Sequence, residues 1–423
     1  MQRMVFILII LAFNCGALFA QTTNRLAPGA PGHDAHWPSA AKQGFGTANT
    51  TRSKIWFTLA DGVMTEVYYP TLDAPNVQML QLIIVDGSSV QTEAEDTIHH
   101  TEVLGSRSLS FRQVNVARSG NYKITKTYTT YPRRNTVLID VKFESRSPAY
   151  VYVYYDPSLN NSGMHDTGWT EDDALLVVDS DKVSALISNT RFAPVHELIR
   201  DTPTVAYSAE QRLSSGYLGT SDGLTELRRN RSGPALYTRA ENGNVVQVAA
   251  LKGFQDWSSP LVKHCTLALG FGKTPGEALR NARASLAKGF DAIRREYESG
   301  WHNYVATLPT VESKYQRQFN MAAMVLKALE DKTYRGAFIA SPSIPWGGGP
   351  NANAATVSGY HAVWSRDLYH VATAFFAMGD QATANRALDY LFRIQQKPDG
   401  SFPQNSWVDR RPIGGGLQMD QVA

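Results

Sequence analysis

Cysteine is scarce in this sequence, and its charges nearly cancel. The 423 residues include two cysteines, Cys15 and Cys265, and Cys15 lies in a segment that we expect to be removed. A single remaining thiol cannot form an internal disulfide, so packing must stabilise the fold, and we expect Cys265 to be a buried, unreactive thiol in a strand. The 41 basic and 38 acidic residues give a net charge of +3, which gives no reason to expect binding to nucleic acid or to an acidic membrane surface.

Long apolar runs are also scarce, except at the N-terminus. Arg3 precedes the apolar run Met4–Phe13, and residues 17–20 (ALFA) form a plausible cleavage site. This pattern is typical of a secretory signal peptide over residues 1–20, and the run is too short to span a bilayer. We therefore expect a secreted or periplasmic protein without a membrane partner after cleavage. A lipid anchor on Cys15 is the less favoured alternative.

The region from Lys54 to about Gly272 has the pattern of β-structure. Apolar residues alternate, or β-branched and aromatic residues gather, in short runs separated by turns such as Asp61-Gly62. The predicted strands are Lys54–Leu59, Gln81–Val85, Tyr122–Thr130, Val137–Phe143, Val151–Tyr155, Val245–Ala250 and Thr266–Phe271. Helical spacing does not alternate with these runs, so we predict a large antiparallel β-sandwich instead of a βαβ sheet.

The period changes at Thr274, where Thr274-Pro275-Gly276-Glu277 forms a capping box with proline at the first helical position. It predicts one helix that runs towards Gly300. Further helices are predicted from about Glu312 to Asp331, Asp367 to Met378 and Gln381 to Gln396. We therefore predict a sandwich domain over residues 21–273, a linker helix and connection over 274–311, and a helical domain over 312–423.

Two clusters of polar and aromatic residues flank the last two predicted helices. Trp364-Ser365-Arg366-Asp367 precedes the first helix and residues 402–409 (FPQNSWVD) follow the second, so both lie at the same end of an antiparallel pair. This composition suits a sugar, because an indole stacks on the apolar face of a pyranose while arginine donates to hydroxyls and aspartate accepts from them. The alternative is a core tryptophan and an ion pair at the helix start, with the aspartate as a cap.

Longer motifs resemble a known family. The run Gly336–Ala423 resembles the start of the catalytic domain of the bacterial glucoamylase and glucodextranase family. The matching segments are GAFIASPSIPWG (336–347), GYHAVWSRDLYHVATAF (359–375), ATANRALDYLFRIQQKPDGSFPQNSWVD (382–409) and GGLQMDQVA (415–423). APGAPG (27–32), GFGTA (44–48) and residues 53–87 resemble the N-terminal domain of the same family. The resemblance implies a sandwich followed by an (α/α)6 toroid, which we expect to be incomplete in this sequence.

The resemblance also implies an activity, the release of glucose from the non-reducing ends of α-glucans with inversion, as in a glucan 1,4-alpha-glucosidase or a glucodextranase. Inverting hydrolysis uses an acid and a base roughly 6.5–9.5 Å apart. In the family both come from later parts of the toroid, so we expect them beyond Ala423 and expect this chain alone to be inactive. An inverting disaccharide phosphorylase and a non-catalytic glycan-binding protein remain alternatives.

By resemblance, Arg366 and Asp367 match the pair that holds the hydroxyls of the terminal glucose, and Trp364 matches the apolar wall beside it. Ser365 replaces the commoner proline and is expected to loosen the turn. The other residues with implied substrate-binding roles are Asn405, Trp407, Asp409, Gln418 and Asp420.

Other candidate sites are weaker. His99-His100 is expected to be a surface pair instead of a metal site, because further ligands at a suggestive spacing are missing. Glu171-Asp172-Asp173 allows a structural Ca²⁺, although a solvated turn is favoured. Residues 164–169 are expected to form an exposed loop. We therefore expect a monomer that needs no cofactor and whose partner is an α-glucan oligosaccharide or polysaccharide.

Overall fold

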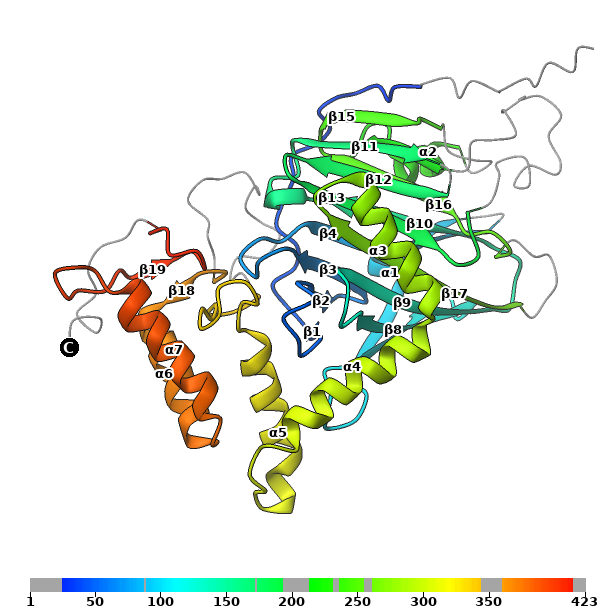
Figure 1. The fold of residues 1–423 in the computed structure, drawn as a ribbon. Coiled ribbons are helices and arrows are strands. Elements are labelled where there is room, and N and C mark those ends of the chain that lie inside the picture. The colour runs from blue at the N-terminus through cyan, green and yellow to red at the C-terminus, as the bar shows by residue number, and fades with distance from the viewer. Residues whose placement is uncertain are drawn as a thin grey trace, which may run out of the picture.

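A computed structural model describes residues 25–86, 89–171, 173–192, 213–230, 236–254, 261–343 and 360–413. Two stacked sheets form the N-terminal part, and helices follow them in the chain (Figure 1). The predicted signal peptide and the residues Asp172, Gln418 and Asp420 lie outside the described residues. Within the described ranges, no helix is long and apolar enough to cross a membrane.

The first sheet has the strand order β1-β2-β3-β4-β10-β16-β14, and β5 pairs with β4. Its neighbouring strands are antiparallel. The strands are β1 (Gly44–Thr47), β2 (Trp56–Ala60), β3 (Val63–Tyr68), β4 (Val77–Val85), β5 (Val90–Thr92), β10 (Tyr150–Pro157), β14 (Leu213–Tyr217) and β16 (Val245–Ala250).

The second sheet has the order β15-β11-β12-β13-β17-β9-β8-β7-β6 and is also antiparallel. Its strands are β6 (Thr97–Val103), β7 (Phe111–Ala117), β8 (Tyr122–Thr130), β9 (Thr136–Ser145), β11 (Asp166–Glu171), β12 (Ala174–Asp179), β13 (Lys182–Ser188), β15 (Arg239–Gly243) and β17 (Leu261–Gly272). The structure therefore confirms the predicted antiparallel sandwich.

The main core lies between the two sheets. Alternate residues of β9, namely Val137, Ile139, Val141 and Phe143, are fully buried in it, as their period-2 spacing predicts. Cys265 on β17 belongs to the same cluster, and burial raises the pKa of its thiol. The prediction of a buried, unreactive cysteine in a strand agrees with this environment.

Helices α3 (Pro275–Lys288) and α4 (Phe290–Val305) follow the last strand. Thr274 caps α3 by accepting a hydrogen bond from the Glu277 amide, as the capping box predicts, whereas the Glu277 carboxylate accepts the Lys273 amide instead of the Thr274 amide. The prediction of one continuous helix is wrong, because Gly289 between the two helices has a φ of 85° and breaks the helical path. α3 packs on the second sheet, where a Cβ on Gly270 would come within 2.5 Å of the Ala278 carbonyl oxygen.

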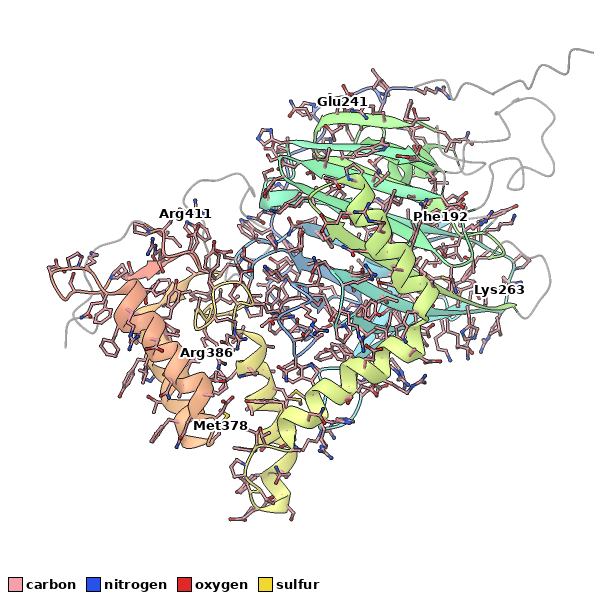
Figure 2. All side chains as sticks on the ribbon, in the orientation of Figure 1. Phe192, Glu241, Lys263, Met378, Arg386 and Arg411 are labelled. Atoms are coloured by element: carbon pink, nitrogen blue, oxygen red, sulfur yellow. The ribbon has the colours of Figure 1, made fainter. Side chains whose placement is uncertain are left out.

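The last described elements are one helix, a helix pair and a short ribbon at one end of that pair. They are α5 (Ser313–Ala328), β18 (Val363–Trp364), α6 (Ser365–Ala377), α7 (Gln381–Tyr390), a π-helical segment (Leu391–Gln395) and β19 (Asn405–Ser406). The remaining short elements are α1 (Glu93–Asp96), η1 (Leu159–Asn161) and α2 (Gly223–Arg229). In Figure 2, Met378 and Arg411 mark opposite ends of the α6–α7 pair, and β18 and β19 lie at the Arg411 end.

Candidate functional site

The two predicted loops meet at the Arg411 end of the helix pair. β18 and β19 pair antiparallel, with Val363 opposite Ser406 and Trp364 opposite Asn405. The helix pair therefore brings the segment before α6 and the segment after α7 side by side. Candidate site residues that are about 40 positions apart in sequence become cross-strand neighbours.

Trp364 and Asn405 each carry a polar atom that lacks a partner. Trp364 is partly buried and contacts the ring of Tyr360 edge-on at 6.4 Å, but its indole Nε1 is buried and makes no hydrogen bond. Asn405 is 5% exposed, and its Oδ1 is likewise buried and unpartnered. An unpartnered buried donor and acceptor are unfavourable, and at this ribbon they lie on neighbouring strands, opposite each other.

Arg366 and Asp367 lie in the first turn of α6 and face solvent. Their side chains are 44% and 42% exposed, and the Arg366 Nε to Asp367 Oδ2 distance is 4.0 Å, at the outer limit of an ion pair. The N-cap residue of α6 is Trp364, whose side chain makes no capping bond. Asp367 is therefore not the helix cap, and its carboxylate lies in the first turn, where the positive end of the helix dipole favours a negative charge.

Ser365 differs from its prediction. We expected this residue to loosen the turn, but the side chain is buried and its hydroxyl donates to the carbonyl oxygen of Pro403 at 2.8 Å. The bond connects the start of α6 to the loop before β19. Serine at this position therefore fastens the two loops together.

The second loop binds largely to itself. The carboxylate of Asp409 accepts from Nε of Arg411 at 2.6 Å and from the Arg411 amide at 3.1 Å, and it is 26% exposed. The backbone of Trp407 bonds to that of Arg411 and Arg410, and Arg410 has a positive φ of 74°. The turn therefore uses the Asp409 carboxylate, while no polar contact of the Trp407 indole is described.

Residues that hold the ribbon were not predicted from the sequence. In the π-helical segment, the amide of Gln395 donates to the Val363 carbonyl oxygen at 3.0 Å and to the Ser406 hydroxyl at 3.1 Å, which clamps β18 to β19. The Tyr390 hydroxyl donates to the Val408 carbonyl oxygen at 2.9 Å, and burial raises the Tyr390 pKa to about 12. The sequence pattern offered no signal for the π turn that points Gln395 inward.

Comparisons with known proteins cover nearly the whole chain. Residues 27–306 match the family model "Glucodextranase, domain N", and residues 314–398 match "Glycosyl hydrolases family 15". A glucoamylase from Clostridium sp. (strain G0005) is 36% identical over 409 residues, which are 95% of this chain and 54% of that protein. The chain belongs to the glucoamylase and glucodextranase family.

A solved structure of a bacterial glucoamylase complexed with acarbose has the same fold as this family member. The TM-score is 0.84 at 35% sequence identity, and the match covers 94% of this chain and 56% of that chain. The predicted fold class, a β-sandwich followed by the helices of an α/α toroid, is confirmed. The chain spans about half the length of both relatives.

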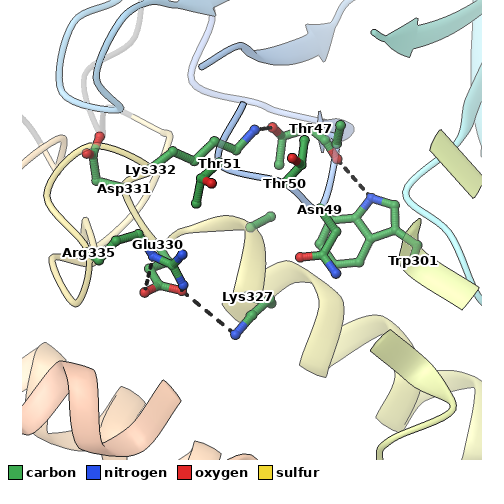
Figure 3. A pocket seen from close by; sticks show the side chains of 12 residues that line it. Thr47, Asn49, Thr50, Thr51, Trp301, Lys327, Glu330, Asp331, Lys332 and Arg335 are labelled. Atoms are coloured by element: carbon green, nitrogen blue, oxygen red, sulfur yellow. Dashed lines mark hydrogen bonds and ion pairs between the residues drawn. The ribbon is translucent and has the colours of Figure 1, made fainter. Parts of the chain in front are cut away.

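In this family member a cavity of about 170 Å³ lies between the sandwich and α5, away from the ribbon (Figure 3). Lys332 lines it and is partly buried. Its ammonium donates to the Thr47 hydroxyl and the Ser53 carbonyl oxygen and lies 4.5 Å from the ring centre of Trp56. Burial lowers the Lys332 pKa well below its ordinary value. None of the predicted site residues lines this cavity, so we interpret it as part of the junction between the sandwich and the helices that follow it.

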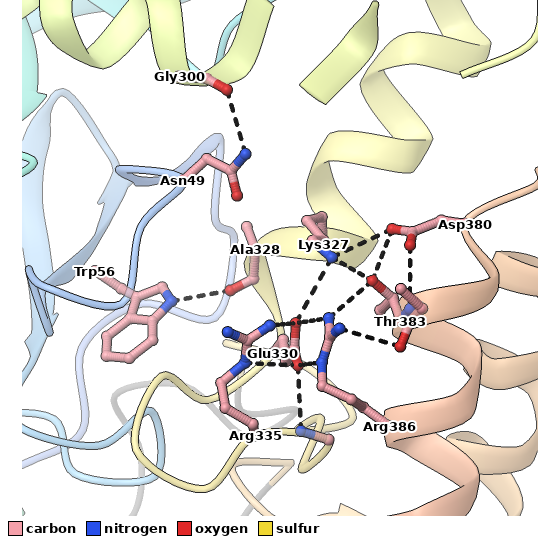
Figure 4. Close-up of polar contacts among 12 residues, drawn as sticks. Asn49, Trp56, Gly300, Lys327, Ala328, Glu330, Arg335, Asp380, Thr383 and Arg386 are labelled. Carbon is pink, nitrogen blue, oxygen red and sulfur yellow. Dashed lines mark hydrogen bonds and ion pairs between the residues drawn. The ribbon is translucent and has the colours of Figure 1, made fainter. Parts of the chain in front are cut away.

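Glu330 organises an ion network beside the same cavity (Figure 4). Its carboxylate is 5% exposed and accepts paired bonds of 2.8 and 2.9 Å from Arg335, and of 2.8 and 3.0 Å from Arg386 of α7. Burial alone would raise the Glu330 pKa, but the bonds from Arg386 and Arg335 outweigh burial and hold it below 4.5. The network therefore joins the loop after α5 to α7.

The weaker candidates gain no support as sites. Among the described residues, no group of three or more histidine, cysteine, aspartate or glutamate side chains is placed to hold a metal ion. His99 and His100 lie on β6. The prediction of an exposed loop over residues 164–169 is wrong, because Asp166–Glu171 forms β11 between β12 and β15. Trp169 on that strand contacts the guanidinium of Arg239 at 5.8 Å.

Proposed function

We propose that this protein is an exo-acting α-glucosidase that releases glucose from the non-reducing ends of α-glucans by inverting hydrolysis. The reaction would be of the glucan 1,4-alpha-glucosidase or the glucodextranase type. The proposal rests on the family membership and on the similarity to the relative from Clostridium, a glucoamylase. It also includes secretion to the periplasm or the medium, action as a monomer without a required cofactor, and the domain division at residues 273 and 311.

The observation that carries the proposal is the start of α6. Arg366 and Asp367 present a cation and a carboxylate side by side and more than 40% exposed, two and three residues after Trp364. Two neighbouring sugar hydroxyls can accept from the guanidinium and donate to the carboxylate, and the indole can cover the apolar face of the ring. Asn405 lies opposite Trp364, so its amide is on the same face of the ribbon as the indole.

This arrangement favours a terminal sugar. A glucose unit whose hydroxyls are bound by charged side chains cannot carry a further glucose on those hydroxyls. Binding at Arg366 and Asp367 would therefore select the non-reducing end, and the chain would extend outward from its reducing side. We assign the catalytic acid and base to none of the described residues, and we assign sugar binding to Trp364, Arg366, Asp367, Asn405 and Trp407. The roles of Asp409, Gln418 and Asp420 remain part of the same proposal.

Binding calorimetry with end-modified sugars tests the proposal on the chain as printed. Maltotriose and maltotriitol, in which the reducing end is converted to an alcohol, should bind equally. Maltotriose that is blocked at the 4- and 6-hydroxyls of its non-reducing end should not bind. Asp367→Ala should weaken maltotriose binding by about 10- to 100-fold, the effect of removing a charge-assisted hydrogen bond. The matched control is Asp389→Ala on α7, whose carboxylate is 60% exposed and pairs only with Arg393 four residues later among the described contacts.

Three outcomes would contradict the proposal. Equal affinity for the blocked and unblocked sugars would point to a glycan-binding protein that recognises internal residues. An effect of Asp389→Ala as large as that of Asp367→Ala would remove the evidence for a specific grip. Rapid glucose release from maltose or isomaltose by this chain would overturn the expectation that the acid and base come from later parts of the family's toroid.

A further inference from the structure

The sandwich contacts the ribbon of the candidate site directly, through Asp73. This residue lies in the loop between β3 and β4, and its Oδ2 accepts the backbone amide of Val408 at 3.0 Å. Oδ1 accepts the hydroxyl of Thr71 at 2.6 Å, so the carboxylate is held from its own side as well. Val408 is 1% exposed and lies between Trp407 and Asp409. One carboxylate of the sandwich therefore fixes the middle of the second site loop, 335 residues further along the chain.

A second contact holds the segment before Trp364. The hydroxyl of Tyr68, at the end of β3, lies 3.0 Å from Nε2 of His361, and the two rings meet edge-on at 5.3 Å. Glu66 on the same strand bonds to Tyr68 at 3.2 Å and pairs with Lys42 at 2.7 Å. Tyr68, Glu66 and His361 are each at most 1% exposed, so this contact is a packed and dry one.

The residue next to Asp73 makes a third connection. The backbone amide of Leu72 donates to Oδ2 of Asp331 at 2.8 Å, and the other oxygen of Asp331 accepts the amides of Thr333 and Tyr334. The loop between β3 and β4 therefore holds the segment after α5 and the segment after β19 at adjacent positions. This loop therefore holds both segments in place relative to the sandwich.

We propose that the sandwich positions the sugar-binding loops, with Asp73 and Tyr68 as positioning residues for the ribbon that carries Trp364, Trp407 and Asp409. The sugar-binding role of these loops rests on the proposed function, whereas their anchoring by the sandwich rests on the contacts alone. Clusters that bind by oriented hydrogen bonds lose affinity when their supporting contacts loosen, even when every binding residue is still present. The π-helical segment after α7 holds the ribbon through Gln395, and the sandwich holds the adjoining segments through Asp73 and Tyr68.

Hydrogen–deuterium exchange and maltose binding, measured on the same variants, test this inference. Asp73→Ala should speed amide exchange in residues 405–411 and weaken maltose binding by about tenfold, since one charge-assisted hydrogen bond to the loop is removed. Asp73→Asn keeps an oxygen acceptor and should restore most of both. Tyr68→Phe should speed exchange in residues 360–364 instead, because it removes the bond to His361 and leaves Asp73 intact.

The matched control is Asp86→Ala. Its carboxylate also accepts a backbone amide, that of Ser89 at 2.6 Å, but both residues belong to the sandwich. The control should leave exchange in residues 405–411 and maltose affinity unchanged. Unchanged exchange in residues 405–411 of Asp73→Ala, or an equal change in the control, would overturn the inference. If the unmodified chain binds no maltose, the proposed function fails, and the exchange arm still decides whether the sandwich anchors the loop.

Discussion

Replacing Glu330 with glutamine should destabilise the contact between the loop after α5 and the helix pair. The substitution keeps the size of the side chain and removes its charge, while Arg335 and Arg386 remain. In the native protein each guanidinium donates two hydrogen bonds to this carboxylate, at 2.8 to 3.0 Å. A neutral amide has one acceptor oxygen and an NH₂ group that would face a guanidinium donor.

The size of the effect follows from the burial of the three groups. Removing one partner of a fully buried ion pair costs about 3–5 kcal/mol. Here Glu330 is 5% exposed, but Arg335 is 38% and Arg386 is 30% exposed, so both cations regain some hydration. We discount the full value for this screening and expect a loss of about 2 kcal/mol in the free energy of unfolding.

Urea unfolding followed by tryptophan fluorescence measures this loss. With a slope of about 3 kcal/mol per molar urea, a loss of about 2 kcal/mol lowers the unfolding midpoint by roughly 0.7 M. Glu312→Gln is the matched control, because Glu312 pairs with Lys314 at 3.1 Å while both side chains are more than 60% exposed. A midpoint for Glu330→Gln that stays within the scatter of the control would refute the reasoning.

The folded-state pKa values of Glu330 and Asp380 lie below 4.5 and 3.8, respectively. The stabilisation from these two carboxylates is therefore present above those values and is lost as the pH falls through the folded-state pKa values. The unfolding midpoint should drop on acidification, and it should drop less in Glu330→Gln. Gly336→Ala should lower the free energy of unfolding by at least about 1–3 kcal/mol, because φ is 91° and the new Cβ would lie 2.2 Å from the Arg386 carbonyl oxygen. Gly400→Ala is the control, since its φ is 86° but its Cβ would meet open space, so that only the backbone is strained. Equal unfolding midpoints for the two variants would contradict this prediction. Cys265 should not react with a thiol reagent in the native protein and should react fully in denaturant. Labelling of the native protein at the rate of an exposed thiol would show that Cys265 is accessible to solvent.

Local patterns in the sequence predicted much of the sandwich. Each predicted strand overlaps an observed one, and β8 and β16 have the predicted bounds, because alternation of apolar residues reports directly which face is buried. β11 escaped prediction, since its sequence DTGWTE has no apolar alternation. It is a strand because β12 and β15 pair with it on both sides, and that information is not local.

The helical part shows the same limit. Apolar spacing continues across Gly289, so the break between α3 and α4 depends on one backbone angle instead of on the pattern. At the candidate site, the pairing of the two loops followed from the antiparallel helices. The roles of Asp73 and Gln395 did not, because a side chain that fixes a distant backbone amide has the same sequence signature as any surface polar residue.

The contact between Asp73 and Val408 also has a consequence for biosynthesis. Domains generally fold as units from the N-terminal side while the chain is being made. Asp73, in the loop after β3, is synthesised 335 residues before Val408, whose backbone amide donates to the Asp73 carboxylate. A sandwich that has already folded thus offers the emerging helix pair a docking surface, and the loop around Val408 takes its shape against a segment that was made before it.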